Sequence, residues 1–411
     1  MMNIFKIAFR NLYRQKRRTF LTMSIISVGV TAVLLFTSLA GSFKGMMIGQ
    51  ITDSMLGHAQ IHRAGYVSAI DNMPLNRMFT KQQFERLEKV LKDIPEIEAY
   101  SGRILFNAMI SNYLETTNIK VSAIDPSHEQ AVTPLLKSRI KEGAMLKPGE
   151  ILLPEMLAKG LKAKVGQELV FIATNADGSV NGQSFKVAGI IESVVGPTGK
   201  YGYLHVNDAA TLLRMDALEY SEVALRVRKM GDLDKTIAQF DKKLPELKNK
   251  DGKPVFELHT WKELSPFSTI ARMIDIMNMF IKVILVAIVL ISIMNVMVMA
   301  VYERIREIGT LSAIGTLPKT IRAIFLSEGL LLGAGGALAG SVLGAILIGI
   351  AKVAKLTIAF GQKDRIPLNP DLPFSQMAVV ALVILAVSAI ASLEPAFKAS
   401  RMDPVEALRH N

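Results

Sequence analysis

Cysteine is absent from the sequence, which excludes disulfide bonds, cysteine-ligated metals and thiol catalysis. Charge is also scarce, because only 20% of the 411 residues are charged, whereas 50% are hydrophobic. Long stretches contain almost no charged residue, which is typical of a membrane protein. The net charge is +12, but no RNP, zinc-finger or OB-like pattern accompanies it. We therefore expect the basic residues to face a membrane surface, and we expect no nucleic-acid partner.

Four apolar runs are long enough to cross a bilayer, which takes about 20 helical residues. They cover residues 20–39, 277–301, 321–351 and 377–393. The third run has roughly 31 residues and would extend about 46 Å as a helix, at about 1.5 Å per residue. We therefore expect this helix to tilt, to bend at a glycine or to project from the bilayer.

The charges that flank these runs predict the orientation of the chain. The first run follows six basic residues and no acidic one, and basic flanks are usually cytoplasmic. Four crossings then place both termini in the cytoplasm. The short segment after the third run is also basic and disagrees with this rule. The residues that support the orientation are Lys6, Arg10, Arg14, Lys16, Arg17 and Arg18, and those that disagree are Lys352, Lys355, Lys363 and Arg365.

The first 18 residues have an amphipathic pattern. Phe5, Phe9 and Leu12 recur at helical spacing between basic residues, which predicts a helix along the inner membrane surface. A disordered basic anchor is one alternative. A signal peptide cleaved near Ala40 is another, although the apolar run is longer than usual for one.

Residues 41–272 have ordinary globular composition and predict a mixed α/β domain. The clearest element is a β-hairpin, in which residues 168–172 and 184–191 alternate in polarity around a turn at Asp177-Gly178.

No catalytic or metal-binding set emerges in this domain. Residues 138–141 match S-x-x-K without its companion motifs, and residues 196–200 lack the spacing of a phosphate-binding loop, which makes a turn the better interpretation. His58 and His62 could share a strand face, but no third metal ligand is evident, which favours surface or capping histidines. The sequence therefore predicts no enzyme activity, no metal and no cofactor on this chain.

Four segments around the apolar runs, in a characteristic order along the chain, carry a family resemblance. Residues 302–315 read YERIREIGTLSAIG, residues 325–329 read FLSEG, and residues 261–264 read WKEL. The last segment, 394–409, begins with Glu394, where the family more often has Tyr. Together these segments closely resemble the FtsX-like permeases, which include the MacB-type exporters and the lipoprotein-releasing LolC/LolE subunits. The order of one helix, a large domain and three helices is similar over the whole chain.

The resemblance implies an α+β membrane protein with four transmembrane helices, one plus three, and a large mixed α/β extracytoplasmic domain. We expect it in the cell inner membrane. The expected parts, in chain order, are a basic amphipathic helix (1–18), the first transmembrane helix (19–40), the external domain (41–272), a stalk with the second helix (273–302), a cytoplasmic coupling loop (303–319), the third helix (320–352), an external loop (353–375), the fourth helix (376–394) and a cytoplasmic tail (395–411).

The resemblance also implies how such a protein acts. Members of this family pair as a homodimer or heterodimer, and each permease contacts a cytoplasmic ABC ATPase. The sequence has no Walker A motif, so we expect the ATPase, with its ATP and Mg²⁺, to be a separate polypeptide. Motion of the ATPase would reach the external domain and extract or export amphipathic cargo such as lipoproteins. The alternative is an FtsX-like signalling subunit that controls an external partner or senses peptides.

The loop between the second and third runs is the expected coupling element. Ile308, Leu311 and Ile314 fall on one face of an amphipathic helix, which suits a groove on a partner protein; a membrane-surface helix is the alternative. Gly315 should end this helix and Pro318 should begin the next. The residues assigned to ATPase coupling are Glu303, Arg304, Glu307, Ile308, Gly309, Leu311, Ile314 and Gly315.

Small residues form rows along the third run, which lets helices approach closely in lipid. We expect these rows to pack against a neighbouring helix or the second subunit of a dimer. The residues assigned to helix packing are Gly329, Gly333, Gly336, Gly340 and Gly344. Glu328 lies among them, and we expect it to pair with Arg322 or Lys319 near the inner headgroups.

Overall fold

The computed structural model describes residues 2–192, 201–243, 255–264, 267–360 and 363–409. The segment 196–200 interpreted as a turn lies outside these residues. The chain forms two compact units. A helical unit comprises Met1–Gly45, Ala271–Ile358 and Arg365–Asn411, and an α/β unit comprises Met46–Ile270 and Ala359–Asp364.

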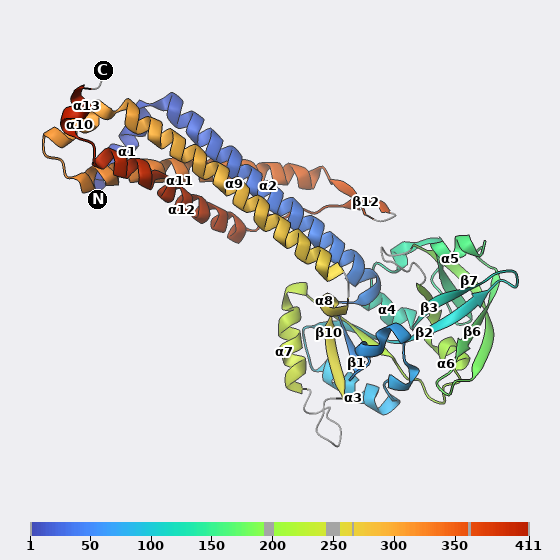
Figure 1. Cartoon of the computed structure of the whole chain (residues 1–411). Coiled ribbons are helices and arrows are strands. Elements are labelled where there is room, and N and C mark those ends of the chain that lie inside the picture. The colour runs from blue at the N-terminus through green and yellow to red at the C-terminus, as the bar shows by residue number, and fades with distance from the viewer. Residues whose placement is uncertain (1, 193–200, 244–254, 265–266, 361–362, 410–411) are drawn as a thin grey trace. The chain divides into compact units, whose positions relative to one another are not determined.

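The helical unit contains long apolar helices, as the four runs predict. Among the described residues, four helices are long and apolar enough to cross a membrane. α11 is a single helix of 36 residues, so the long third run continues without a break. The helices of this unit (Figure 1) are α1 (Met2–Arg14), α2 (Lys16–Ile51), α9 (Phe267–Glu303), α10 (Ile305–Ala313), α11 (Pro318–Val353), α12 (Phe374–Ser400) and α13 (Pro404–Arg409).

Helices α2, α9 and α12 extend beyond the bounds that hydropathy suggests. α2 and α9 each run from one unit into the other, and a π-helix, Thr52–Leu56, follows α2 directly. α12 continues through Pro395 to Ser400, although the sequence placed its end at residue 394. Apolar side chains of α2, α9, α11 and α12 form one buried cluster in the helical unit. The strands β11 (Thr357–Phe360) and β12 (Lys363–Pro367) pair with each other between α11 and α12.

The α/β unit is built on a ten-stranded sheet within the described residues. The strand order is β10-β1-β9-β2-β3-β8-β5-β7-β4, and β6 pairs with β2 and β7. The strands are β1 (Ala59–Arg63), β2 (Ile97–Ser111), β3 (Thr116–Ile124), β4 (Ile140–Gly143), β5 (Glu150–Pro154), β6 (Glu168–Thr174), β7 (Val180–Ile191), β8 (Tyr201–His205), β9 (Glu222–Val227) and β10 (Phe256–Thr260). The helices are α3 (Lys81–Lys92), α4 (Pro126–Val132), α5 (Glu155–Gly160), α6 (Val206–Leu212), α7 (Leu233–Lys243) and α8 (Trp261–Leu264).

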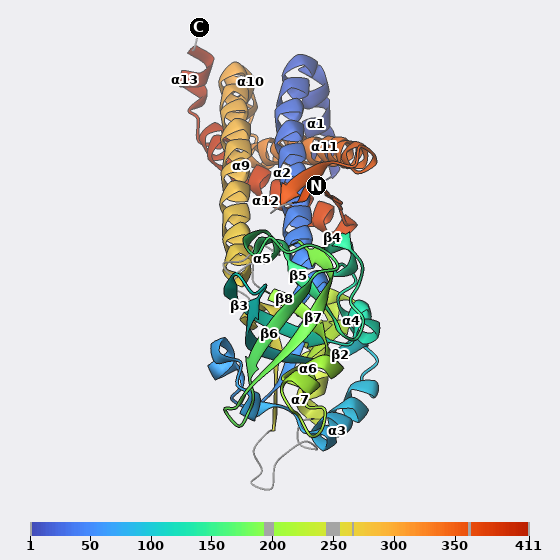
Figure 2. The same cartoon turned by 90° about the vertical axis from the view of Figure 1, so that its right-hand side faces the viewer.

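The β6–β7 hairpin, in front in Figure 2, forms as its sequence predicts. Gly178 has φ +84°, a conformation that glycine tolerates best, and the strands pair from Thr174–Val180 down to Glu168–Lys186. Phe171 and Phe185 bury their rings edge to face, with centroids 5.5 Å apart. A mixed α/β fold of this unit is therefore confirmed.

A buried ionic cluster links the long strand β2 to its neighbours. Arg103 on β2 donates to Glu129 of α4 at 2.5 and 3.0 Å and to Glu222 of β9 at 2.9 Å. All three side chains are almost fully buried. His62 of β1 lies 3.4 Å from Glu222. Burial alone would raise the pKa of Glu222, but His62 and Arg103 outweigh it and lower that pKa.

The two histidines considered as metal ligands have other roles. The backbone N–H of Val227 donates to Nδ1 of His58, whose Nε2 lies 3.3 Å from Asp53. His62 belongs to the buried cluster. Both are buried rather than on the surface. Among the described residues, no group of three or more His, Cys, Asp or Glu side chains could hold a metal ion.

Candidate functional site

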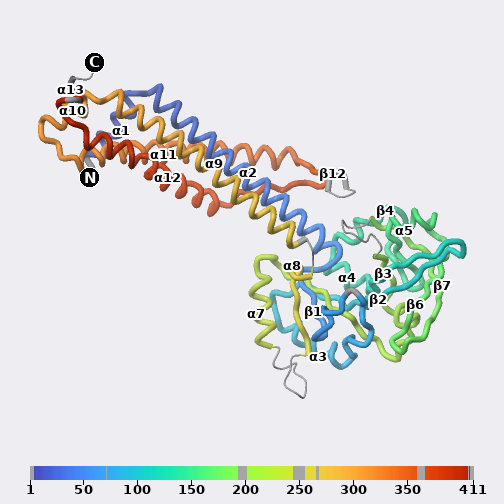
Figure 3. The backbone as a smooth tube through the Cα atoms, viewed as in Figure 1, coloured from blue at the N-terminus to red at the C-terminus, as the bar shows by residue number. Residues whose placement is uncertain are grey.

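The short helix α10 connects the second and third apolar helices and lies with α1 and α13 at one end of the helical unit (Figure 3). α9 ends at Glu303, and Arg304 leaves the helical conformation with φ −117° and ψ 22°. Gly315 has φ +89° after α10, and Pro318 begins α11. Leu317 precedes Pro318 as the N-cap, without a side-chain capping bond. Glycine and proline therefore fix both ends of the turn where the sequence predicts.

A buried carboxylate fixes the start of α10 to the helical unit. The Nη1 of Arg304 donates to Oε1 of Glu328 on α11 at 2.9 Å, and Asn11 Nδ2 of α1 donates to the same oxygen at 2.7 Å. The side chain of Glu328 is only 1% exposed. Arg304 also donates to Glu307 at 2.9 Å and lies 5.8 Å from the centre of the Phe325 ring. These contacts hold three helices together at one point.

The partners expected for Glu328 were wrong. Arg322, six residues before Glu328 on α11, stacks on Phe397 of α12 instead, with its Cζ 4.9 Å from the ring centre. Glu328 reaches Arg304 and Asn11, which are 24 and 317 residues away in the sequence. Hydropathy and helical spacing carry no information about contacts between distant helices.

The acidic residues assigned to coupling make contacts within the chain. Glu303 accepts from Arg18 at 2.6 Å, and Glu307 accepts from Arg14 at 3.4 Å as well as from Arg304. Sequence reasoning missed Asn11, Arg14 and Arg18 as parts of this site. The amphipathic pattern of residues 1–18 was the available signal, since it predicts a helix but not its partner.

Ile308, Leu311 and Ile314, which the sequence predicts on one face of α10, differ widely in burial. Ile308 and Gly309 are buried, and Ile308 belongs to the apolar cluster of the helical unit. Leu311 is 36% exposed and Ile314 is 74% exposed. Leu317, which the sequence did not single out, is 68% exposed. We name Leu311, Ile314 and Leu317 the exposed apolar turn. α10 therefore packs by its first half and exposes its last.

The glycines of α11 lie against two helices of the same chain. A Cβ atom at Gly329 or Gly333 would meet the Oγ atoms of Ser392 and Ser388 of α12 at 1.8 and 2.1 Å. A Cβ at the other three positions would meet α2 at 2.5 to 3.1 Å. Those three positions are Gly336, Gly340 and Gly344, and they face Ile26, Val30 and Leu34.

Two family models match the chain. Residues 19–243 match the MacB-like periplasmic core domain, which is more than half of the 411 residues. Residues 279–404 match the FtsX-like permease C-terminal domain. The chain belongs to the MacB/FtsX family of ABC transporter permeases. It is therefore a permease subunit of the LolC/LolE/MacB/FtsX type, and its membrane-spanning helices and periplasmic-type domain fit an inner-membrane protein.

Relatives of this permease carry related names. It is 28% identical over 436 residues to the lipoprotein-releasing system transmembrane protein LolC of Neisseria meningitidis, covering 98% of both chains. It is 24% identical to LolE of Haemophilus influenzae, covering 93% of this chain and 92% of LolE. It is also 24% identical to the macrolide export ATP-binding/permease protein MacB of Bdellovibrio bacteriovorus, covering 98% of this chain but 61% of MacB.

Solved structures resemble parts of the permease. The extracellular domain of the transporter YknZ aligns with 49% of this chain and 98% of its own, at 14% identity and a TM-score of 0.34. The periplasmic region of MacB from Actinobacillus actinomycetemcomitans aligns with 54% of this chain and 94% of its own, at 13% identity and a TM-score of 0.35.

Proposed function

We propose that this permease receives force from a separate cytoplasmic ABC ATPase at α10 and transmits it to its external domain. The domain then extracts or exports amphipathic cargo such as lipoproteins. The observation that carries the proposal is the exposed apolar turn, which follows directly on a helix start that Arg304 and Glu328 fix to the helical unit.

The exposed apolar turn calls for a partner other than lipid. Leu311, Ile314 and Leu317 lie between the candidate membrane spans Ser268–Glu303 and Pro318–Val353. Exposed apolar residues within a span face acyl chains, whereas these lie outside the spans and would face water. An apolar helix end of this kind fits a hydrophobic groove on a partner protein.

The buried contacts of Glu328 support transmission of force. A displacement of α10 acts on Arg304, and through Glu328 and Asn11 on α11 and α1. A buried ion pair resists separation because each partner would leave an unpaired charge. The pair therefore moves α10 with the helices that it contacts.

The comparison with MacB supports a separate ATPase. The name of that relative includes an ATP-binding part, and the alignment covers 98% of this chain but 61% of MacB. This chain has no Walker A motif. ATP and Mg²⁺ would therefore bind the partner subunit, in an assembly of two permeases, either a homodimer or a heterodimer. The basic residues of α1 and the start of α2 favour a cytoplasmic location for α10 and both termini.

The test is co-purification of the permease with an ABC ATPase encoded beside it. Ile314→Glu places a charge in the exposed apolar turn and should reduce the recovered ATPase about tenfold or more, because burial of an unpaired charge is costly. Leu114→Glu is the matched control, since Leu114 is 91% exposed on the α/β unit. Equal recovery with both variants would contradict the docking role of α10. Mass spectrometry of lipid and protein released from the intact complex would identify the cargo class.

A further inference from the structure

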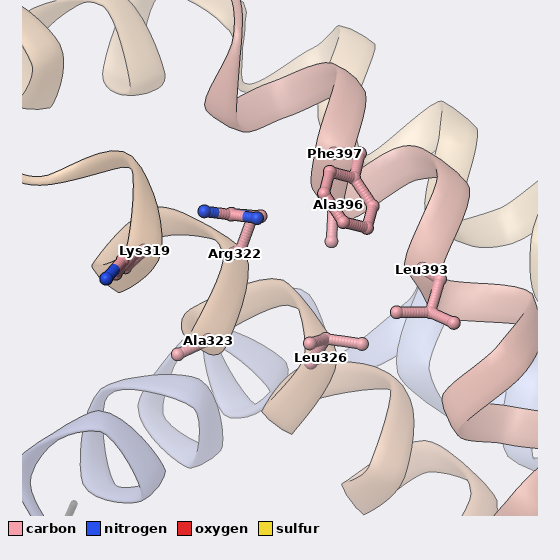
Figure 4. Close-up of a pocket in the computed structure, with 7 residues that line it drawn as sticks. All are labelled: Lys319, Arg322, Ala323, Leu326, Leu393, Ala396 and Phe397. Carbon is pink, nitrogen blue, oxygen red and sulfur yellow. The ribbon is translucent and has the colours of Figure 1, made fainter.

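A pocket lies apart from the contacts of α10 described above. It has a volume of about 350 Å³ and lies between the start of α11 and the end of α12 (Figure 4). The lining residues are Lys319, Arg322, Ala323 and Leu326 of α11, and Leu393, Ala396 and Phe397 of α12. We propose that this pocket binds the headgroup of an anionic phospholipid from the adjacent membrane leaflet.

The polar half of the pocket is basic. Lys319 and Arg322 line it, and the described residues that line it include no acidic side chain. The nearby Glu394 interacts with Lys398 rather than lining the pocket. Two cations without a carboxylate between them attract a phosphate diester, as basic pockets between membrane helices do.

The guanidinium of Arg322 is already positioned for such a ligand. Its Cζ lies 4.9 Å from the centre of the Phe397 ring, and the Cζ of Arg401 lies 6.0 Å from the same ring centre. The Nε of Arg322 is buried, and no described residue accepts a hydrogen bond from it. A buried donor without a partner costs free energy, and a phosphate oxygen in the pocket would satisfy it.

The other half of the pocket is apolar and lies deeper in the membrane spans. Leu326 is one helical turn beyond Arg322, which is about 6 Å along α11. Leu393 lies seven residues before the end of α12 at Ser400. The pocket thus changes from basic to apolar in the direction in which a lipid changes from headgroup to acyl chain. This gradient favours a lipid over free phosphate.

In the orientation proposed above, the adjacent leaflet is the inner one, but the pocket itself does not depend on that orientation. Binding of lipid to the purified permease requires no ATPase. Failure of the lipid test would therefore leave the coupling role of α10 untouched, and loss of ATPase docking would leave the lipid test unchanged.

The experiment is native mass spectrometry of the full-length permease in detergent, titrated with phosphatidylglycerol or with phosphatidylcholine of the same acyl chains. We expect phosphatidylglycerol to bind more tightly. Lys319→Gln with Arg322→Gln should weaken phosphatidylglycerol about 25-fold, because each basic residue near an anionic lipid contributes about fivefold. Lys352→Gln with Lys355→Gln, at the other end of α11, is the matched control and should change binding little.

A second variant tests the shape of the pocket separately from the charge of its two cations. Ala323→Phe keeps both cations and fills the pocket, and it should also weaken phosphatidylglycerol. Gel filtration of each variant checks that the permease remains folded. Equal weakening by the control pair, or full binding by Ala323→Phe, would overturn the proposal. Competition by inorganic phosphate at matched concentration would assign the site to a free anion. If the pocket variant Lys319→Gln with Arg322→Gln lost ATPase recovery but kept lipid binding, the site would be assigned to a protein. Either result overturns the proposal.

Discussion

Each of the two units contains an arginine held by two glutamates, and the two clusters differ in exposure. In the α/β unit, Arg103, Glu129 and Glu222 are all nearly inaccessible to water. In the helical unit, Glu328 is equally buried, but Glu307 is about half exposed. A sealed cluster has its geometry fixed by the fold around it. We call the Arg103 cluster the sealed cluster and the Arg304 cluster the open cluster. The open cluster can respond to a partner that approaches α10, whose last turn is exposed.

The largest expected effect is the loss of Arg103. Arg103→Met would leave Glu129 and Glu222 buried without their cation, and should destabilise the α/β unit by about 3–5 kcal/mol. The effect is measured by thermal unfolding of the full-length permease, with protease resistance as the readout. Arg86→Met is the control, because Arg86 is exposed on α3. A midpoint equal to that of the control would mean that the sealed cluster does not stabilise the fold.

The next effect should follow Glu328→Gln. The amide can still accept a hydrogen bond but removes the charge that Arg304 requires, so we expect a loss of about 1–3 kcal/mol. Under the proposed coupling, the ATPase rate of the complex should also become insensitive to cargo. Unfolding and cargo-dependent ATP hydrolysis are measured on the same preparation. A variant less stable than Arg103→Met would reverse the ranking of the two clusters.

Acid should weaken the sealed cluster. The pKa of Glu222 is below its usual 4.5, so its stabilising contribution is complete above that pH and is lost as the pH falls through the lower, folded-state value. The unfolding midpoint of the permease should therefore decline below about pH 4.5. Glu222→Gln should show a shallower decline. Parallel curves for both proteins would show that other carboxylates control the acid sensitivity.

The smallest effect is expected at the exposed edge of the open cluster. Arg14 pairs with Glu307 at 3.4 Å, and both side chains are largely exposed. Arg14→Gln should change stability by at most about 0.5 kcal/mol, because exposed pairs are weak and screened by salt. Arg18→Gln, whose arginine is more buried and 2.6 Å from Glu303, should cost somewhat more. A larger loss at Arg14 would show that the edge of the cluster is not open in the membrane.

Local signals allowed much of the fold to be predicted. The four long helices follow from apolar length, and the end of α10 and the start of α11 follow from Gly315 and Pro318, which impose backbone conformations by themselves. The β6–β7 hairpin follows from alternation and Gly178. Hydropathy predicts the end of the fourth span at residue 394, and α12 continues past that position through Pro395 to Ser400.

Contacts between distant segments could not be predicted. The partner of Glu328 depends on how α1, α10 and α11 meet, and no spacing within α11 encodes that. The difference in burial along α10 has the same cause, because burial of Ile308 depends on neighbouring helices. The glycine rows predicted close approach, but only the structure shows that Gly333 faces α12 while Gly336 faces α2.

The glycine contact between α11 and α12 has a mechanical consequence. Ser388 and Ser392, which lie against Gly333 and Gly329, donate to carbonyl groups one turn earlier in their own helix, both at 2.7 Å. Each serine occupies space that a side chain on α11 would need, since a Cβ at Gly329 or Gly333 would lie within 2.1 Å of a serine Oγ. Sliding of the two helices would bring the serines against residues that carry a Cβ, and pulling the helices apart would open two gaps with nothing to fill them. The two glycines therefore fix the register of α12 on α11 as well as their spacing.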